Sequence, residues 1–194
     1  VDSIFYCAPD ARLKIVECSM KEKSGIVLSS LTGGVALDST KVSLPRMTLT
    51  TPDSNVEMEC DMDLNAFDVK NPGKVYLRFF AEIGKQDVMR FAGDMPQQFI
   101  MRYPNHPISV RLSLNGNMNH ARISAFDVSL PTAFKLNAEG YAVNPTDIKR
   151  MKAEMRLRGT TYNIGFLTAL APMPSNVRIP SGISLAAHLK ADRQ

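Results

Sequence analysis

Strict alternation of apolar and charged residues over nine positions constrains the fold of this chain more than any other feature. From Val56 to Leu64 every even-numbered residue is apolar, and every odd-numbered residue is a carboxylate. Side chains of a β-strand alternate between its two faces, whereas a helix would scatter these residues around its circumference. The segment is therefore predicted to be a strand with one apolar face and one solvated face. The carboxylates are Glu57, Glu59, Asp61 and Asp63.

The same period of two recurs along the chain and predicts a mainly β fold. Four further segments show it clearly, and six show it more weakly. The clear segments are 75–83, 108–115, 134–139 and 151–158. The weaker segments are 12–20, 25–30, 34–44, 46–51, 119–130 and 182–190.

The parity of the apolar positions switches between Ile123 and Phe126 and again across Pro45. Such switches predict β-bulges or bends, and a proline cannot donate to a central ladder. Three alternating stretches are followed by glycine, at positions 116, 140 and 159, and these glycines are expected to end their strands. The spacing suggests hairpins added one after another to an extended sheet, although ordinary meander periodicity also explains it.

Helical patterns are short. Gln86–Ala92 and Asn163–Ala171 each predict about two turns. The second would place Ile164, Leu167 and Ala171 on one side. Together these elements predict a mainly β chain built on an extended, antiparallel, amphipathic sheet with one to three short helices.

The net charge of +4 conceals an acidic half and a basic half. Residues 1–97 carry 11 Lys and Arg against 14 Asp and Glu, whereas residues 98–194 carry 12 against 5. One predicted strand holds a cluster of cations. Solvent exposure explains such a cluster, and contact with anionic lipid headgroups is the alternative. No aromatic platforms for bases are interleaved with it, so no nucleic-acid partner is expected. The cations are Lys149, Arg150, Lys152, Arg156 and Arg158.

Motifs for catalysis and for metal binding are missing. The chain has no Gly-x-Ser-x-Gly, no phosphate-binding loop, no Gly-x-Gly-x-x-Gly and no His-Glu-x-x-His. The row of carboxylates does not converge on one ion, because alternate side chains along a strand lie about 6.6–7 Å apart. We therefore expect no catalytic residue, no metal and no cofactor, and a protein that is not an enzyme.

The three cysteines also give no indication of a metal site. Cys7, Cys18 and Cys60 are odd in number and lack Cys-x-x-Cys spacing. This pattern argues against a zinc site and against a full disulfide framework. Cys60 lies among alternating apolar residues and is expected to be a buried thiol.

Seven segments, in order, carry a resemblance to a known family. They are 24–31, 41–56, 81–92, 107–116, 126–140, 148–159 and 179–185. Together they resemble the AsmA-like superfamily, most closely the TamB-type translocation and assembly module proteins of Gram-negative envelopes. The resemblance covers roughly residues 20–190 and is spread over degenerate repeats.

The resemblance implies a sheet curved into an open trough, β-taco-like, whose concave face is apolar. It implies lipid transport between the inner and outer membranes, with a phospholipid or other acyl-chain lipid as ligand and an outer-membrane assembly protein as a further partner. It also implies a periplasmic location and an inner-membrane anchor in the full-length chain. Residues 1–194 are then expected to form a single β-rich module, a fragment of a longer envelope protein.

The candidate binding residues are the apolar positions of the clearest strands, with the basic cluster as the candidate contact for anionic headgroups. Flexible thioethers among them suit either an irregular core or a surface for variable apolar ligands. The groove candidates are Val56, Met58, Met62, Leu64, Val110, Leu112, Leu114, Phe134, Leu136, Met151, Met155 and Leu157.

Two other architectures fit the same pattern. A structural or adhesive β-sandwich would bury the apolar faces as its core, and a closed barrel with one small ligand would pair its first and last strands. A lipid conduit would instead leave a continuous apolar face exposed, which a soluble monomer normally avoids.

Overall fold

The computed structural model describes residues 3–7, 10–22, 27–144, 151–170 and 182–192. It contains eleven strands, two short α-helices and one 3-10 helix, η1. In chain order these are β1 (Ser3–Cys7), β2 (Asp10–Lys21), β3 (Val27–Leu37), β4 (Lys41–Thr50), β5 (Asn55–Asp63), β6 (Val75–Ile83), α1 (Lys85–Phe91), α2 (Gln97–Arg102), β7 (Ile108–Gly116), β8 (His120–Leu130), β9 (Phe134–Val143), β10 (Lys152–Thr161), η1 (Gly165–Ala169) and β11 (Ser184–Asp192).

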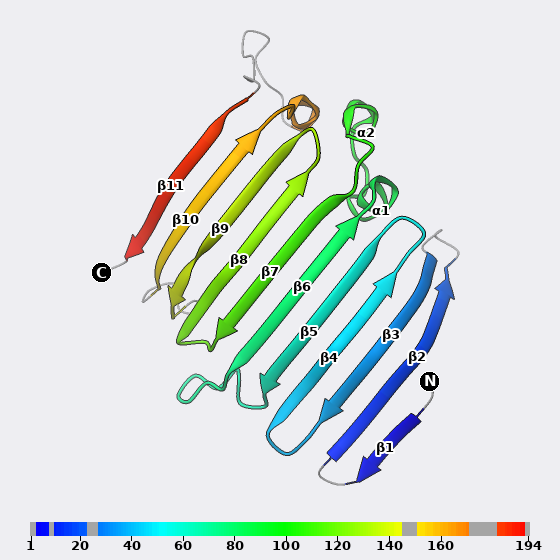
Figure 1. The fold of residues 1–194 in the computed structure, drawn as a ribbon, viewed down its shortest axis with the longest axis vertical. Coiled ribbons are helices and arrows are strands. Elements are labelled where there is room, and N and C mark those ends of the chain that lie inside the picture. The colour runs from blue at the N-terminus through cyan, green and yellow to red at the C-terminus, as the bar shows by residue number, and fades with distance from the viewer. Residues whose placement is uncertain (1–2, 8–9, 23–26, 145–150, 171–181, 193–194) are drawn as a thin grey trace.

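All the strands belong to one antiparallel sheet, in which each strand lies beside the strands that precede and follow it in the sequence (Figure 1). Within the described residues, β1 pairs only with β2 and β11 only with β10. The sheet is therefore open and not closed into a barrel. The prediction of a mainly β chain, with an open antiparallel sheet and one to three short helices, is confirmed.

The cross-strand register keeps the apolar residues on one face. On β5 and β6, Met58 lies opposite Phe79, while Glu59 lies opposite Arg78. Side chains of directly opposed residues project from the same face of a sheet. The alternation that predicted the β5 strand therefore continues, residue against residue, into its neighbours.

The predicted β-bulges are present. The pairing of β4 with β5 shifts between Leu44 and Met47, and the pairing of β8 with β9 shifts between Ile123 and Phe126. A bulge inserts an unpaired residue, so the side chains beyond it change face relative to simple alternation. In a regular strand, Met47 and Phe126 would project from the opposite face to Leu44 and Ile123. The two shifts place them on the same face.

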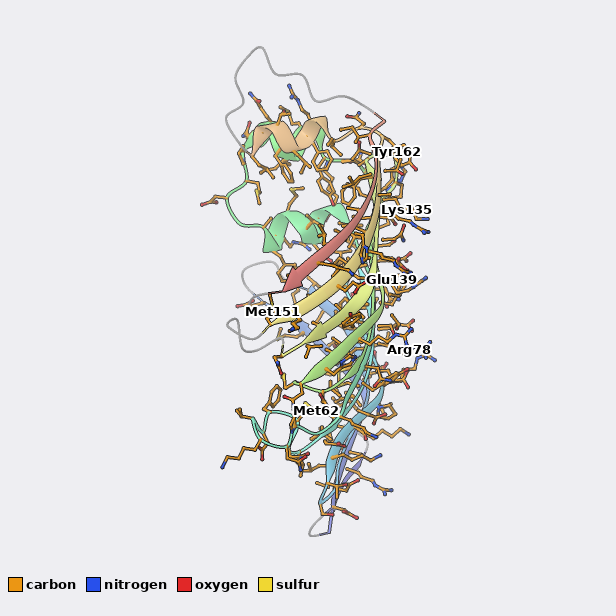
Figure 2. The ribbon with its side chains drawn as sticks, turned by 90° about the vertical axis from the view of Figure 1, so that its left-hand side faces the viewer. Met62, Arg78, Lys135, Glu139, Met151 and Tyr162 are labelled. Carbon is orange, nitrogen blue, oxygen red and sulfur yellow. The ribbon has the colours of Figure 1, made fainter. Side chains whose placement is uncertain are left out.

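The sheet bends toward the side on which the helices lie (Figure 2). Met62 and Met151 lie on this side, whereas Arg78, Lys135 and Glu139 lie on the opposite side. We call the first side the apolar face and the second the polar face. The helices α1, α2 and η1 gather at one end of the strands on the apolar face, and we call them the helical cap.

The structure corrects three local predictions. The predicted strand 34–44 is interrupted by a turn, because the Asp38 carboxylate accepts hydrogen bonds from the backbone N–H groups of Thr40 and Lys41, at 2.7 and 2.9 Å. The segment 163–171, predicted as a two-turn helix, forms the shorter η1, which buries Phe166 while leaving Leu167 exposed; Ala171 lies outside the described residues.

The prediction that three glycines end their strands is wrong for two of them. Gly116 ends β7 as expected, but Gly140 and Gly159 lie inside β9 and β10. Gly140 has a packing reason, because a Cβ atom there would meet the Glu154 carbonyl oxygen and would lie 2.9 Å from the Cα atom of Met155. Gly159 has ordinary space around it, with its nearest contact at 3.5 Å.

Gly140 and Gly159 form a matched pair for testing this close approach of β9 and β10. We expect Gly140→Ala to lower the free energy of unfolding by about 1–3 kcal/mol, since the methyl group has to push backbone atoms aside. Gly159→Ala is expected to be neutral or stabilising by up to about 0.5–1 kcal/mol. Urea unfolding of both variants measures the difference, and equal stabilities would show that the two strands can separate without cost.

Candidate functional site

The apolar face is continuous across eight strands. Residues that oppose one another from β4 to β11 form a central row in which every member is apolar. Cross-strand neighbours of this kind contact one another on the face of a sheet. The row consists of Met47, Met58, Phe79, Leu112, Phe126, Ala138, Leu157 and Ala187.

Parallel rows flank the central row on both sides. On one side the row is Leu49, Val56, Ala81, Val110, Val128, Leu136, Gly159 and Leu185. On the other side it is Leu44, Cys60, Leu77, Leu114, Ile123, Gly140, Met155 and Leu189. The next row beyond it is made mostly of small residues: Val42, Met62, Val75, Gly116, Ala121, Ala142, Ala153 and Ala191.

Ten of the twelve predicted groove residues share this face and are half-buried. These are Val56, Met58, Met62, Val110, Leu112, Leu114, Phe134, Leu136, Met155 and Leu157. The other two lie just outside strands: Leu64 follows β5 and is 52% exposed, and Met151 precedes β10. The structure thus brings the predicted apolar residues onto one surface.

The hydrophobic core formed by the described residues lies beneath the helical cap. Of the eight apolar residues that are buried in the described part of the chain, five belong to the cluster there. Elsewhere the large apolar side chains of this face are half-buried or, as Leu185 and Leu189 are, exposed, and no second layer of described residues covers them. Cys60, predicted to be a buried thiol, shares this half-buried state as a free thiol, and burial, followed by the neighbouring Asp61, raises its pKa.

Three of the five basic residues proposed for headgroup contact lie within the described residues, and all three lie on the opposite side of the sheet. Arg156 opposes Glu139, and Arg158 opposes Asn137, all on the polar face. The Arg156 guanidinium lies 3.7 Å from the Glu139 carboxylate. Lys152 shares this parity, while residues 149–150 lie outside the described part of the chain. One lipid therefore cannot place its acyl chains on the apolar face and its headgroup on Arg156 across the body of the sheet.

The polar face carries cross-strand ion pairs. Arg46 lies 3.3 Å from Glu57, and Arg78 lies 3.5 Å from Glu59. These pairs are exposed, and such pairs are worth about 0–1 kcal/mol each. The predicted row of carboxylates thus faces solvent with arginines from both neighbouring strands beside it. No group of side chains suited to hold a metal ion occurs among the described residues.

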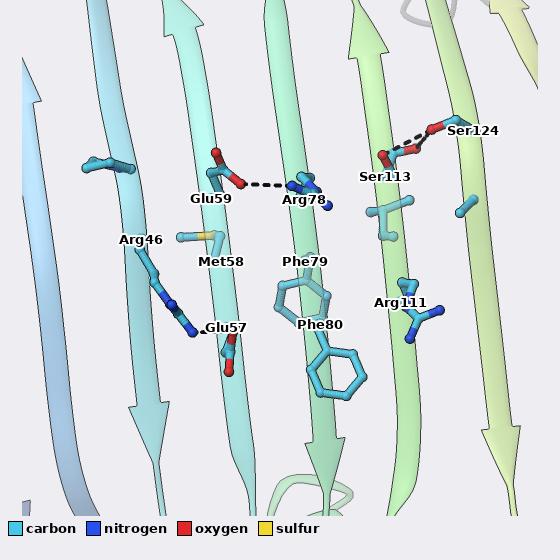
Figure 3. A pocket seen from close by; sticks show the side chains of 13 residues that line it. Arg46, Glu57, Met58, Glu59, Arg78, Phe79, Phe80, Arg111, Ser113 and Ser124 are labelled. Atoms are coloured by element: carbon cyan, nitrogen blue, oxygen red, sulfur yellow. Dashed lines mark hydrogen bonds and ion pairs between the residues drawn. The ribbon is translucent and has the colours of Figure 1, made fainter.

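A shallow depression of about 740 Å³ lies between these pairs (Figure 3). Arg46, Glu57, Glu59 and Arg78 border it, and Phe80 forms part of its floor beside Arg111, whose guanidinium carbon lies 5.8 Å from the ring centroid. Each guanidinium here has a carboxylate or an aromatic ring beside it. The arginines that border the depression are therefore already engaged with groups of the protein itself.

Glu154 joins the last three strands on the polar face, a cluster that sequence reasoning missed. It accepts a hydrogen bond from the Tyr141 hydroxyl at 3.0 Å, and it lies 2.7 Å from His188 Nε2 and 3.8 Å from Lys190 Nζ. The bonds from Tyr141 and then from His188 lower the pKa of Glu154. His120 stacks on the Tyr141 ring with 5.7 Å between centroids. Only the strand register brings these residues together, so this cluster could not be predicted from a local sequence pattern.

Three aromatic rings hold the helical cap on the sheet. The rings of Phe99 in α2, of Tyr103 directly after α2 and of Phe166 in η1 lie with centroids 5.4–5.6 Å apart in tilted or edge-on arrangements. They pack on Leu130 and Ala133, where β8 turns into β9. α2 is not among the predicted helices, although the spacing of Phe99 and Tyr103 by four residues between Pro96 and Pro104 is a helical signal.

Asp87 of α1 fastens the cap to the turn between β4 and β5. Its buried carboxylate accepts hydrogen bonds from Thr51, from Ser54 at 2.6 Å and from Arg90 at 2.8 Å. Burial raises the pKa of Asp87, but the hydrogen bonds from Ser54, Thr51 and Arg90 outweigh it, so the pKa lies below its ordinary value.

Comparisons with protein-family models, with curated proteins and with solved structures gave no significant match to this chain. No helix in the described ranges is long and apolar enough to cross a membrane. Fold and surface together define an open antiparallel β-sheet with one apolar face, and the described residues cover this face only at its capped end.

Asp87→Asn tests the anchoring of the cap. At pH 7 we expect the variant to unfold about 1–3 kcal/mol more easily, since it weakens a buried, charge-assisted network. Because folding lowers the pKa of Asp87, the stabilisation is complete above the unfolded value of about 3.9 and is lost as pH falls toward the folded value. Urea unfolding between pH 7 and pH 3 should therefore show that the difference in the free energy of unfolding between Asp87→Asn and the parent becomes smaller below pH 4. The exposed control Asp94→Asn should have a free energy of unfolding within about 0.5 kcal/mol of that of the parent. If Asp87→Asn differed from the parent by the same amount at every pH, this account would be contradicted.

Proposed function

We propose that this chain is a non-enzymatic lipid-binding module whose apolar face holds the acyl chains of phospholipids or similar lipids during transport. The mechanism is passive. An acyl chain that leaves water for contact with the half-buried side chains gains about 0.8 kcal/mol per buried CH₂ group. The polar face keeps the sheet solvated while the ligand is exchanged.

One observation carries this proposal: the apolar face remains half-exposed across eight strands. Exposed apolar surfaces of this extent mark sites for ligands, membranes or other proteins. The rows that contain Val56, Met58 and Leu114 run across the strands without a charged residue, so an extended hydrocarbon chain meets only apolar contacts along them.

The envelope setting of the proposal comes from the resemblance to AsmA-like and TamB-type proteins. On that basis the module lies in the periplasm, belongs to a longer chain anchored in the inner membrane, and carries lipid between the two membranes. An outer-membrane assembly protein is the further partner that the resemblance suggests.

The alternatives differ in what covers the apolar face. A β-sandwich needs a second sheet, and the described residues form one sheet only. A closed barrel needs its first and last strands to pair, and β1 and β11 do not pair with each other. An adhesive or structural role for the single sheet requires another protein on the apolar face, which the following experiment distinguishes from a lipid.

Photo-cross-linking at adjacent positions on opposite faces tests the proposal. p-Benzoylphenylalanine replaces Leu112 on the apolar face in one variant and Ser113 on the polar face in the other. After illumination with vesicles of phosphatidylethanolamine and phosphatidylglycerol, we expect lipid adducts at position 112 and few at position 113, because only the first faces the proposed acyl-chain surface. Mass spectrometry of the purified chain measures the adducts.

Two results would count against the proposal. Equal adduct yields at both positions would indicate non-specific contact with vesicles. Cross-links from position 112 to protein alone, with no lipid carried through purification, would favour the adhesive alternative.

A further inference from the structure

The helix α2 covers the end of the apolar face. The face continues beyond Val110 through Ile108, Leu130 and Phe134, and these residues lie within or against the cluster formed by the aromatic rings of the cap. Leu130 is only 1% exposed, in contrast to the half-buried Leu112. Contact with α2 and η1 therefore removes this end of the face from solvent and from any ligand bound to the rest of it.

The two α-helices of the cap are held in different ways. Buried Asp87 binds α1 to the turn between β4 and β5, and the backbone N–H of Gln86 donates to Asp53 at 2.8 Å. For α2, no side-chain hydrogen bond to the sheet occurs within the described residues. Its polar link is the Lys85 ammonium, which donates to the Tyr103 carbonyl oxygen at 2.8 Å. Among the described residues, the direct contacts that α2 makes with the sheet are therefore aromatic and aliphatic.

The connections of α2 allow it to move while α1 stays in place. Gly93, between the two helices, has a φ of 68° and open space where a Cβ atom would lie. This conformation favours glycine and places a turn without packing constraints next to α2. Pro96 and Pro104 limit the helix to six residues, and its first turn lacks a side-chain cap.

The closed position of α2 carries an energetic penalty. The Tyr103 hydroxyl is buried and has no hydrogen-bond partner among the described residues. A buried unpaired hydroxyl is destabilising, because it has lost water without gaining a partner. On the outer side of the same helix, Ile100 and Met101 are exposed, the latter by 74%. The helix therefore offers apolar side chains both to the sheet and away from it.

We propose that α2 is a lid that lifts from the end of the apolar face when an acyl chain advances along the sheet. The proposal rests on the function proposed above, because the acyl chain is what replaces α2 on Ile108, Leu130 and Phe134. The lid turns about Gly93, while α1 remains fixed by Asp87. Lifting returns the Tyr103 hydroxyl to water and lets Phe99 contact the ligand from above.

Hydrogen exchange with the intact chain tests the lid. Peptides covering residues 97–103 report the amides of Ile100 and Tyr103, which bond to Pro96 and Phe99, and peptides covering 85–92 report the corresponding amides of α1. We expect α2 to exchange faster than α1, and addition of phosphatidylethanolamine and phosphatidylglycerol vesicles to speed exchange in α2 about fivefold or more while leaving α1 unchanged.

Tyr103→Phe separates a lid from a merely loose helix. Removing the unpaired hydroxyl favours the closed position, so exchange in α2 without lipid should slow about fivefold. The acceleration by lipid should then need a higher lipid concentration. Tyr76→Phe on the polar face serves as the control and should leave exchange in α2 unchanged.

The outcomes distinguish the lid from the underlying function. If position 112 cross-links to lipid but lipid leaves exchange in α2 unchanged or slows it, the lid is wrong and the lipid surface stands. If position 112 yields no lipid adducts, the proposed function fails and the lid fails with it. Faster exchange in α1 and α2 together would also overturn the lid, since α1 is its fixed anchor.

Discussion

Cross-strand register is the constraint on which this structure depends. Within the described residues each strand pairs only with its sequence neighbours, and over most of the sheet no second layer there could correct a slip in pairing. A slip of one residue would turn every side chain of a strand to the other face. The apolar residues stay together because Met58 opposes Phe79 and Phe79 opposes Leu112. Such a slip in one strand would place charged side chains from its alternate positions among these apolar neighbours. The uncovered face is thus a direct consequence of a pattern maintained strand by strand.

The bulges show how this register survives changes in sequence parity. Pro45 cannot donate to a ladder, and it falls where the pairing between β4 and β5 is already interrupted. Beyond the interruption, Met47 rejoins the face to which Leu44 belongs. Bulges also increase local twist and bend the strands that carry them. The same irregularities therefore preserve the apolar surface and contribute to the curvature seen in Figure 2.

The strands and two of the bulges follow from local chemistry, and the sequence therefore predicts them well. β6 spans 75–83 as the alternation indicates, and ten of the twelve apolar candidates share one face, since side-chain direction depends only on parity and pairing. The same parity places Lys152, Arg156 and Arg158 of β10 on the polar face, because they alternate with the apolar residues of that strand. α2 and the Glu154 cluster escaped prediction for another reason: both depend on contacts between segments distant in sequence. A six-residue helix has little intrinsic stability, so the weak helical signal from the spacing of Phe99 and Tyr103 is not enough, and packing on Leu130 and Phe166 stabilises α2.

The contrast between the capped end and the rest of the apolar face has an energetic meaning. At the cap, side chains such as Leu130 already have most of the hydrocarbon contact that burial provides, at about 25 cal/mol per Å² of apolar area. On the central row, Leu112 and Met58 keep part of that area exposed, so any apolar molecule that covers them stabilises the sheet by mass action. A ligand thus gains most on the central rows and gains at the capped end only by replacing contacts that exist already. The penalty of the unpaired Tyr103 hydroxyl reduces the cost of that replacement. At the most completely buried end of the surface, the proposed ligand would therefore have to displace side chains of the protein itself, here those of Phe99 and Tyr103.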